Sequence, residues 1–321
     1  MNIEATDKKH YFFYGGLAIA LLIRLAFLLF PYAFWIDMNS FRGWTTGLIQ
    51  YGIGNFYSAM WSDYPPGYMY VLWLTGKIYQ LFDPGLQHTD GTLLIASIKL
   101  VPILADMGGA ILIWQMLKDR IPLTSAYAAS LSYAFNPLII FVSAVWGQVD
   151  SMSIFMMLLV AFLLLQERFI SAGLIGAISL IVKPQGLFLA PLFFFSQWFK
   201  QAWWKWLVAV IASLGMIWSM VLPFYWQQRD FATIWTTLIS PFQFLYQRMM
   251  ATAATYPYAS VNAFNIWGAV NWQPDASEIF GLSYRLIGLC LLGTLLAWIG
   301  VFLYKHPQNS DFFLAGAIIL L

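Results

Sequence analysis

Residues 11–30 read YFFYGGLAIALLIRLAFLLF, twenty residues with a single charge, Arg24. A bilayer core about 30 Å thick needs about 20 predominantly apolar residues per helix, so this stretch is long enough to cross a membrane. A short polar head with Lys8 and Lys9 precedes it, and it lacks a small-residue cleavage site. We therefore expect a retained anchor whose N-terminus is cytoplasmic.

The rest of the chain shares this apolar character. Of its 321 residues, 61% are hydrophobic and 9% are charged, whereas soluble proteins average about 25% charged residues. Sixteen Lys and Arg against 14 Asp and Glu leave a net charge of +2, which provides no basic surface for nucleic acid. The composition therefore predicts an integral membrane protein and excludes soluble enzymes and DNA-binding proteins.

Further apolar stretches of transmembrane character follow. They are residues 68–82, 94–117, 123–146, 151–166, 171–199, 203–222 and 282–304. A last run, 312–321, is half a span, and the chain stops inside it, which indicates a piece of a longer protein. Pro137 and Pro184 could break helices because proline lacks the N–H that a helix interior needs. The predicted fold class is an all-α polytopic membrane protein, with residues 1–321 forming a single transmembrane domain.

Two long segments, residues 31–66 and 223–281, are too polar to lie in lipid. Both are rich in Trp, Tyr and Phe, which favour the membrane–water interface, so we expect short helices lying along the membrane surface. If the first segment is external, the count of predicted spans places the second on the same face. We therefore expect two long external loops side by side.

Charged residues at membrane depth need a reason, because each costs a few kcal/mol or more unless it faces the bundle interior. Four residues qualify: Arg24, Lys99, Asp106 and Lys183. Lys99 and Asp106 share one face of a predicted helix, about 10 Å apart, where they could line a cleft or pair with neighbouring helices. Arg24 and Lys183 are the better candidates for holding an anion such as a lipid phosphate. An interhelical ion pair or a side chain that reaches toward the membrane surface is an equal alternative for each.

The first long loop contains WIDMNSFRGW at residues 35–44 and SDYPPGY at residues 62–68. Asp37 lies a few residues beyond the first membrane exit, where it could act as a general base on a substrate hydroxyl. The alternative is an N-cap of a surface helix, the commoner role of an isolated Asp. Asp63 returns to the same face and could be a second acidic member of the site, although the prolines after it could simply end the loop.

Polar residues also mark the middle of the chain. Asn136-Pro137 and the stretch WGQVDS at residues 146–151 bracket a helix end and a new start. We favour Asp150 or Ser151 as the N-cap of that new helix over a role in substrate binding.

The second long loop combines aromatic rings with amides in the stretch YPYASVNAFNIW, residues 256–267, and Arg248 lies just upstream. Tyr258 and Asn262 in this stretch would suit a sugar stacked on an aromatic ring and hydrogen-bonded by an amide. A surface helix with an aromatic belt would look much the same, so both interpretations stay open.

Taken in order, these residues resemble the GT-C glycosyltransferases, multi-pass membrane enzymes that transfer a sugar from a polyprenyl- or dolichyl-phosphate carrier. The likeness is greatest to the ER glucosyltransferases that extend the lipid-linked oligosaccharide of N-glycosylation and to their prokaryotic mannosyltransferase-like relatives, and it covers nearly the whole chain. The matching features are Asp37 with Arg42 and Trp44, Asp-Tyr-Pro-Pro at 63–66, Lys99 with Ala105-Asp106, Gly147-Gln148, Lys183 with Gln185, and residues 256–267. The chain lacks the His and Asn of the family's Gly-His-Phe-Gln-Tyr-Asn stretch, and Pro184 separates Lys183 from Gln185.

The resemblance implies a GT-C helix bundle in a bacterial inner membrane or the ER membrane. It implies inverting transfer of a hexose to a hydroxyl of a glycan or lipid-linked acceptor on the non-cytoplasmic face, with Asp37 as catalytic base and Asp63 and Arg42 as orienting residues. Candidates for binding the donor's phosphate or sugar are Arg24, Lys183, Arg248, Tyr258 and Asn262. Structural or cleft-lining roles fall to Lys99, Asp106, Gln148 and Asp150.

This chemistry requires no cofactor, and the sequence holds no Asp-x-Asp pair for a nucleotide-sugar cation, although a divalent cation stays compatible with it. A transporter or flippase of a lipid-linked saccharide is the alternative from another class, because it too would carry charges inside its bundle. Its usual sign, repeated halves, is not visible in the chain. A non-catalytic scaffold related to the enzymes is a further alternative, and loss of Asp37 would mark it.

Overall fold

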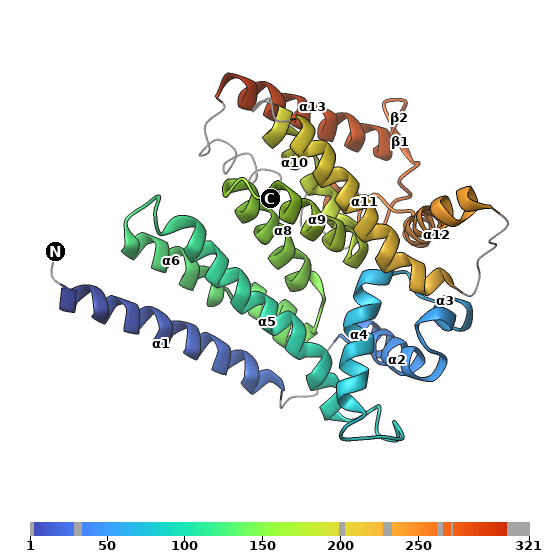
Figure 1. Ribbon diagram of the computed structural model, residues 1–321, viewed down its shortest axis with the longest axis horizontal. Coiled ribbons are helices and arrows are strands. Elements are labelled where there is room, and N and C mark those ends of the chain that lie inside the picture. Colours follow the sequence, from blue (N-terminus) through green and yellow to red (C-terminus); the bar gives the residue numbers. More distant parts are fainter. Residues whose placement is uncertain are drawn as a thin grey trace.

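The structure is a computed structural model that consists mainly of helices (Figure 1). It describes residues 3–28, 34–198, 203–226, 233–261, 266–270 and 272–306. Four helices in these ranges are long and apolar enough to cross a membrane, and a bent helix pair could be a fifth. The four are α1 (Ile3–Leu28), α5 (Thr92–Leu117), α11 (Trp203–Tyr225) and α13 (Tyr284–Lys305). The architecture is therefore that of an all-α membrane protein.

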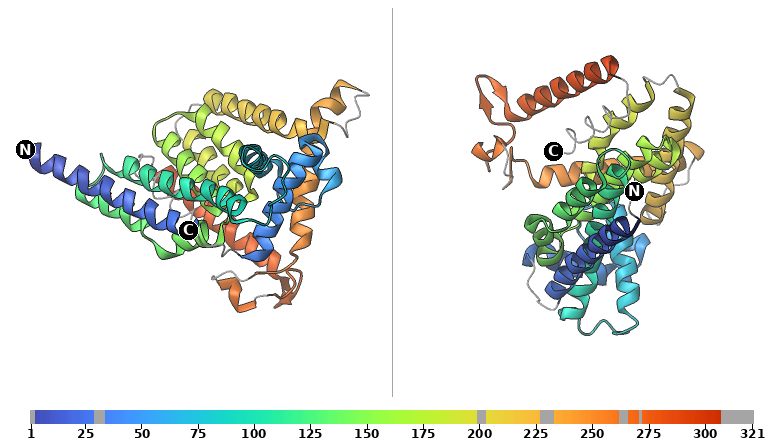
Figure 2. Two further views of the ribbon diagram at one scale, coloured as in Figure 1. Left: turned by 90° about the horizontal axis from the view of Figure 1, so that it is seen from below. Right: turned by 90° about the vertical axis from the view of Figure 1, so that its left-hand side faces the viewer.

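Helices α1, α5 and α6 (Leu123–Ala134) pack together, and the N-terminal end of α1 projects from the molecule (Figure 2). Phe13 of α1 contacts Trp114 near the end of α5, and its ring stacks on Tyr127 of α6, with centroids 4.4 Å apart. Arg24, eleven residues further along α1, pairs instead with Asp106, which precedes Trp114 on α5. Helices α1 and α5 are therefore antiparallel, and α5 begins at the end of the molecule where α1 finishes.

The predicted span 123–146 is bent rather than continuous. Helix α6 ends at Ala134, and the chain turns by 42° into α7 (Pro137–Ile140) and the π-helix η2 (Phe141–Trp146). The Asn136 side chain accepts a hydrogen bond from the Leu138 backbone N–H at 2.9 Å and so caps the new helix. This confirms the prediction of a break at Pro137.

A second group of helices follows: α8 (Asp150–Leu165), α9 (Phe169–Val182), η3 (Pro184–Leu189) and α10 (Ala190–Trp198). The predicted span 171–199 is wrong as one helix, because the chain breaks at Lys183. Lys183 has extended backbone angles, φ −151° and ψ 132°, which is the conformation favoured before proline. The prediction that Pro184 could break a helix is confirmed.

The first long loop folds into helices, as predicted for its aromatic composition. They are α2 (Trp35–Tyr51), η1 (Ile53–Asn55) and α3 (Phe56–Ala59), and α4 (Pro66–Tyr79) follows them. The predicted span 68–82 is wrong. Its helix, α4, has 14 residues and rises about 21 Å, too little for a bilayer core. Because α5 starts where α1 finishes, the chain between them begins and ends on one side of the molecule.

The second long loop contains α12 (Ile234–Thr255), η5 (Ile266–Val270) and a short hairpin of β1 (Glu278–Ile279) and β2 (Leu282–Ser283). The surface helix was predicted and the hairpin was not. Ser283 caps α13 by accepting a hydrogen bond from the Leu286 N–H at 3.2 Å.

The largest buried apolar cluster joins the first loop to the bundle. It includes Phe41 of α2, Leu72 of α4, Ile181 of α9 and Phe224 of α11. Helices α2 and α4 are therefore packed onto the bundle end, and this packing positions the polar residues described next.

Candidate functional site

Asp37 lies in the first turn of α2, where its side chain is half-buried. Two donors reach the same carboxylate oxygen, Oδ2: the indole Nε1 of Trp146 at 2.8 Å and the amide Nε2 of Gln148 at 2.9 Å. The N-cap residue of α2 is Phe34, and no side-chain capping bond is formed there. The capping interpretation of Asp37 is therefore wrong, and its carboxylate is held by the end of η2 and the turn that follows it.

Gly147 makes this arrangement possible because it adopts φ +81°, a left-handed conformation that suits glycine. A Cβ at this position would lie 2.7 Å from Met38 Cε and 3.0 Å from Lys99 Cγ. The turn therefore packs tightly against both α2 and the buried Lys99 side chain. This packing places the Lys99 side chain close to the site.

Gln148 is buried and also contacts Tyr64. Its Oε1 accepts hydrogen bonds from the Val149 backbone N–H at 2.8 Å and from the Tyr64 hydroxyl at 3.2 Å. Burial raises the pKa of Tyr64 well above its usual range, so the hydroxyl keeps its proton and donates. The amide orientation of Gln148 follows, with its NH₂ group directed at Asp37.

Asp63 lies at the junction of the two long loops. Its Oδ2 accepts a hydrogen bond from the Tyr256 hydroxyl at 3.4 Å, and its backbone carbonyl accepts one from the Thr252 hydroxyl. Burial raises the pKa of Asp63, and the charge of Asp37 raises it further, while Lys183 lowers it. The two acidic residues and Lys183 therefore share one electrostatic environment, as expected for Asp37 and Asp63.

Lys183, at the break between α9 and η3, forms an ion pair with Asp150. Its ammonium nitrogen also lies 5.9 Å from the centre of the Tyr64 ring. Asp150 is the first residue of α8, whose N-cap is Val149 without a side-chain bond, so the predicted capping role of Asp150 or Ser151 is wrong. The proline-induced break brings the Lys183 ammonium to this carboxylate instead.

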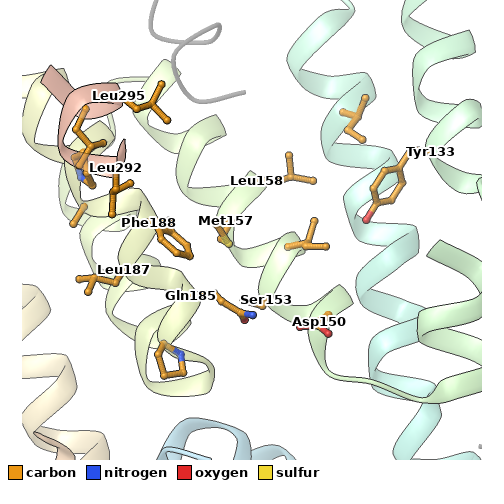
Figure 3. Close-up of a pocket in the computed structure, with 16 residues that line it drawn as sticks. Tyr133, Asp150, Ser153, Met157, Leu158, Gln185, Leu187, Phe188, Leu292 and Leu295 are labelled. Atoms are coloured by element: carbon orange, nitrogen blue, oxygen red, sulfur yellow. The ribbon is translucent and has the colours of Figure 1, made fainter. Parts of the chain in front are cut away.

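An open cavity of about 1150 Å³ begins beside this ion pair. Asp150, Ser153 and Gln185 gather toward one end, and apolar side chains such as Phe188 and Leu292 line the remainder (Figure 3). The cavity lies among α8, η3, α10 and α13, with contributions from α5 and α6. It has the shape and polarity to take a long apolar chain with a polar head.

Arg24 and Asp106 are fully buried where α1, α5 and α6 meet. Arg24 Nε donates to Asp106 Oδ2 at 3.2 Å, and its Nη1 donates to the carbonyls of Ala20 at 3.1 Å and Ala134 at 2.7 Å. Both side chains have 0% exposure, so Arg24 has no open path to a lipid phosphate. The structure therefore favours the interhelical ion pair over the predicted anion-binding role of Arg24, because a buried charge needs a partner.

Arg42 does not orient Asp37. Five residues along a helix correspond to a rotation of about 140°, so the two side chains leave different faces of α2. The guanidinium donates to the Thr89 carbonyl at 2.6 Å and to Asn39 Oδ1 at 3.1 Å, which ties α2 to the segment before α5. The predicted orienting role of Arg42 is wrong in this geometry.

The residues of the second loop that were predicted to bind the donor contact different parts of the molecule. Arg248 on α12 has its guanidinium 5.4 Å from the centre of the Tyr57 ring, and no residue in the described ranges forms a hydrogen bond with its buried Nε. The ring of Tyr258 packs against the ring of Trp272 in the same loop, with ring centroids 5.3 Å apart. Asn262 lies outside the described residues.

Sequence reasoning missed three members of this site: Trp146, Tyr64 and Tyr256. Trp146 was noted only as part of a helix end, and Tyr64 only as part of an Asp-Tyr-Pro-Pro stretch. A polar pair beside a glycine, as in Trp146-Gly147-Gln148, is a signal for a turn that presents side chains in one direction. Among the described residues, no group of three or more His, Cys, Asp and Glu side chains is arranged to hold a metal ion.

Taken together, the site consists of a carboxylate, Asp37, fixed from the bundle, with Asp63, Tyr256 and the Lys183–Asp150 pair around it. It lies where the two long loops meet the helix bundle (Figure 1). In comparisons with known proteins, the chain matches no protein-family model and no curated protein.

Proposed function

We propose that the protein is an integral membrane hexosyltransferase that uses a polyprenyl-phosphate-linked sugar as donor and acts on the non-cytoplasmic face. The observation that carries this proposal is the Asp37 carboxylate, half-buried and held through one oxygen by Trp146 and Gln148. A positioned carboxylate that keeps one oxygen available is the group that a general base requires.

In the proposed reaction, Asp37 accepts the proton of the acceptor hydroxyl while that oxygen attacks the anomeric carbon of the sugar. The new carbon–oxygen bond forms on the face opposite the lipid phosphate. The bond from the anomeric carbon to the phosphate oxygen breaks, and the phosphate leaves with that electron pair, so the configuration at the anomeric carbon inverts. The leaving phosphate is already ionised and needs no protonation by a second acid.

Lys183 and Arg248 are the cations proposed to stabilise the phosphate. Lys183 forms an ion pair with Asp150, which lines the polar end of the 1150 Å³ cavity. Within the described residues, the buried Nε of Arg248 has no hydrogen-bond partner. The apolar remainder of the cavity would hold the prenyl chain of the donor. A donor bound in this way would place its phosphate between the membrane-depth cavity and the Asp37 carboxylate.

The test is a transfer assay with protein purified in detergent. The probes are farnesyl-phosphate glucose and farnesyl-phosphate mannose, with a membrane lipid extract as the source of acceptors, and release of farnesyl phosphate is measured. Asp37→Asn should lower turnover at least 100-fold, because general-base catalysis contributes roughly 10²–10⁴-fold.

Asp119→Asn is the matched control, because it removes an exposed carboxylate from the turn after α5 and should leave turnover unchanged. Near-normal transfer by folded Asp37→Asn protein would contradict the proposal. Movement of an intact lipid-linked saccharide across a vesicle membrane, without release of the phosphate, would support a transporter instead.

A further inference from the structure

We propose that Trp146 and Gln148 are positioning residues that bind Oδ2 of Asp37 and thereby leave Oδ1 as the oxygen that receives the acceptor proton. This inference rests on the proposed function and adds to it which oxygen acts and what aims it. Trp146 and Gln148 touch neither substrate nor reacting atoms and act through Asp37.

Both hydrogen bonds end on the same oxygen, at 2.8 Å and 2.9 Å. Within the described part of the chain, no hydrogen bond reaches Oδ1 of Asp37. Donors on one oxygen restrict rotation of the carboxylate and give its two oxygens different environments. Oδ1 is therefore the more basic oxygen and the one available to a substrate.

Gln148 can act on Asp37 only as a donor. Its Oε1 already accepts from the Val149 N–H and the Tyr64 hydroxyl, so a reversed amide would lose both bonds. The reversed amide would also place its oxygen against the Asp37 carboxylate, which repels it. The orientation is thus set by the hydrogen-bond network rather than by the amide alone.

Trp146 is held just as firmly. Its indole packs against Phe34 with ring centroids 5.1 Å apart and against Phe141 at 6.1 Å. It is the last residue of the π-helix η2, and π-helical turns widen a helix locally and change where its last side chains point. Gly147 then reverses the chain, so Trp146 and Gln148 converge on one atom although one residue separates them.

The two donors and Asp37 belong to different parts of the molecule. Trp146 is the last residue of η2 and Gln148 lies between η2 and α8, whereas Asp37 lies on α2 of the first loop. These hydrogen bonds therefore align α2 with the helix bundle that carries the proposed donor cavity. Loss of either bond should misdirect the base without removing it.

The experiment uses the full chain, the same farnesyl-phosphate sugars, and the variants Trp146→Phe and Gln148→Met. Each variant should lower kcat by about tenfold and change KM for the donor less than threefold, because a misdirected base impairs the chemical step more than binding. A merely structural role would instead lower the midpoint of thermal unfolding or raise KM together with the loss of kcat.

Trp61→Phe and Gln80→Met are the matched controls, since the hydrogen bonds described for Asp37 involve neither residue, and both variants should leave kcat and KM unchanged. Thermal unfolding and gel filtration report folding of each variant. If Trp146→Phe or Gln148→Met does not fold, Tyr64→Phe is the replacement. It removes only the hydroxyl that holds Gln148 Oε1 and should lower kcat in the same way by a smaller factor.

The outcomes separate this inference from the proposed function. If Asp37→Asn abolishes turnover while the folded Trp146, Gln148 and Tyr64 variants keep the wild-type kcat, the positioning roles are wrong and the function stands. If Asp37→Asn keeps its turnover, the proposed function itself fails. A loss of kcat accompanied by an equal rise of KM for the donor, or by a lower midpoint of thermal unfolding, would indicate a structural role and would also overturn the inference.

Discussion

Single charged residues in this protein serve two different purposes. Arg24 and Asp106 pair with each other inside the bundle, whereas Asp37, Asp63 and Lys183 gather where the loops meet the bundle. Both groups carry charge that would be costly in isolation, but only the side chains of the second group are partly exposed. The two groups differ in how exposed their side chains are and in which residues they pair with, and neither property can be read from their positions in the apolar stretches.

The buried pair of Arg24 and Asp106 leads to a stability prediction. Arg24→Met should lower the free energy of unfolding by about 3–5 kcal/mol, because it leaves Asp106 buried without its cation. Circular dichroism of the detergent-solubilised protein during heating measures this. The double variant Arg24→Met with Asp106→Leu should unfold at a higher temperature than the Arg24→Met variant. Equal unfolding temperatures for wild type and Arg24→Met would contradict the assignment of a structural ion pair.

Asp63 leads to a prediction about pH. Because burial raises its pKa in the folded protein, the carboxyl group stabilises the fold while it is protonated, below its ordinary pKa near 4. That contribution is lost as the pH rises through the raised value, where a charged Asp63 is buried near Asp37. Asp63→Asn should therefore raise the midpoint of thermal unfolding at pH 7.5 by about 1–2 °C and leave it unchanged near pH 3. A lower midpoint at pH 7.5 would mean that the charged form stabilises the fold.

Helices α4 and α9 approach each other closely at Gly67. A Cβ on Gly67 would lie 2.6 Å from the backbone carbonyl carbon and oxygen of Ile181 and from the backbone nitrogen of Val182. Backbone atoms cannot move aside as a flexible side chain can. The helix that was predicted to cross the membrane is therefore held across the bundle end by a contact that only glycine permits.

Gly67→Ala should accordingly destabilise the protein by about 1–3 kcal/mol, because the two helices must separate. Gly43→Ala is a matched control, since Gly43 also lies in a helix but a Cβ there would meet nothing within 4 Å. That substitution should be neutral or stabilising by about 0.5–1 kcal/mol, because alanine favours the helix. Equal unfolding midpoints for the two variants would show that the contact between α4 and α9 is loose.

At the scale of the whole molecule, the two long loops form one end of the protein. Thr252 and Tyr256 of the second loop bond to Asp63 of the first, although nearly two hundred residues separate them. The turn after α5 lies at the opposite end of the α1, α5 and α6 group, because these helices alternate in direction. The molecule therefore has two distinct ends, and the candidate site belongs to the end formed by the loops.

Cysteine labelling in intact cells or sealed vesicles tests how these ends face the membrane. In a Cys290→Ala background, we expect a membrane-impermeant maleimide to label Trp61→Cys and Phe280→Cys from the non-cytoplasmic side. Both side chains are exposed, and they lie in the first and second long loops respectively. Asp119→Cys should react only after the membrane is permeabilised. Labelling of positions 61 and 119 from the same side would contradict the proposed topology.

The sequence by itself determined the class of protein, because apolar runs long enough for a bilayer and a 9% charge content leave no soluble alternative. It also located the breaks at Pro137 and Pro184, where local chemistry decides the backbone conformation. It also indicated Asp37 as the candidate catalytic residue and placed Asp63 in the same loop.

Only the tertiary structure decided which polar residues meet. The partners of Asp37 are 109 and 111 residues away in the chain, Asp106 pairs with Arg24 across 82 residues, and α4 packs on the bundle instead of crossing it. A side chain's local pattern shows that it needs a partner, since a buried charge is costly, but the pattern does not name that partner. The partner is set by how helices cross, and the directions of α1, α5 and η2 emerge only when the whole chain is packed.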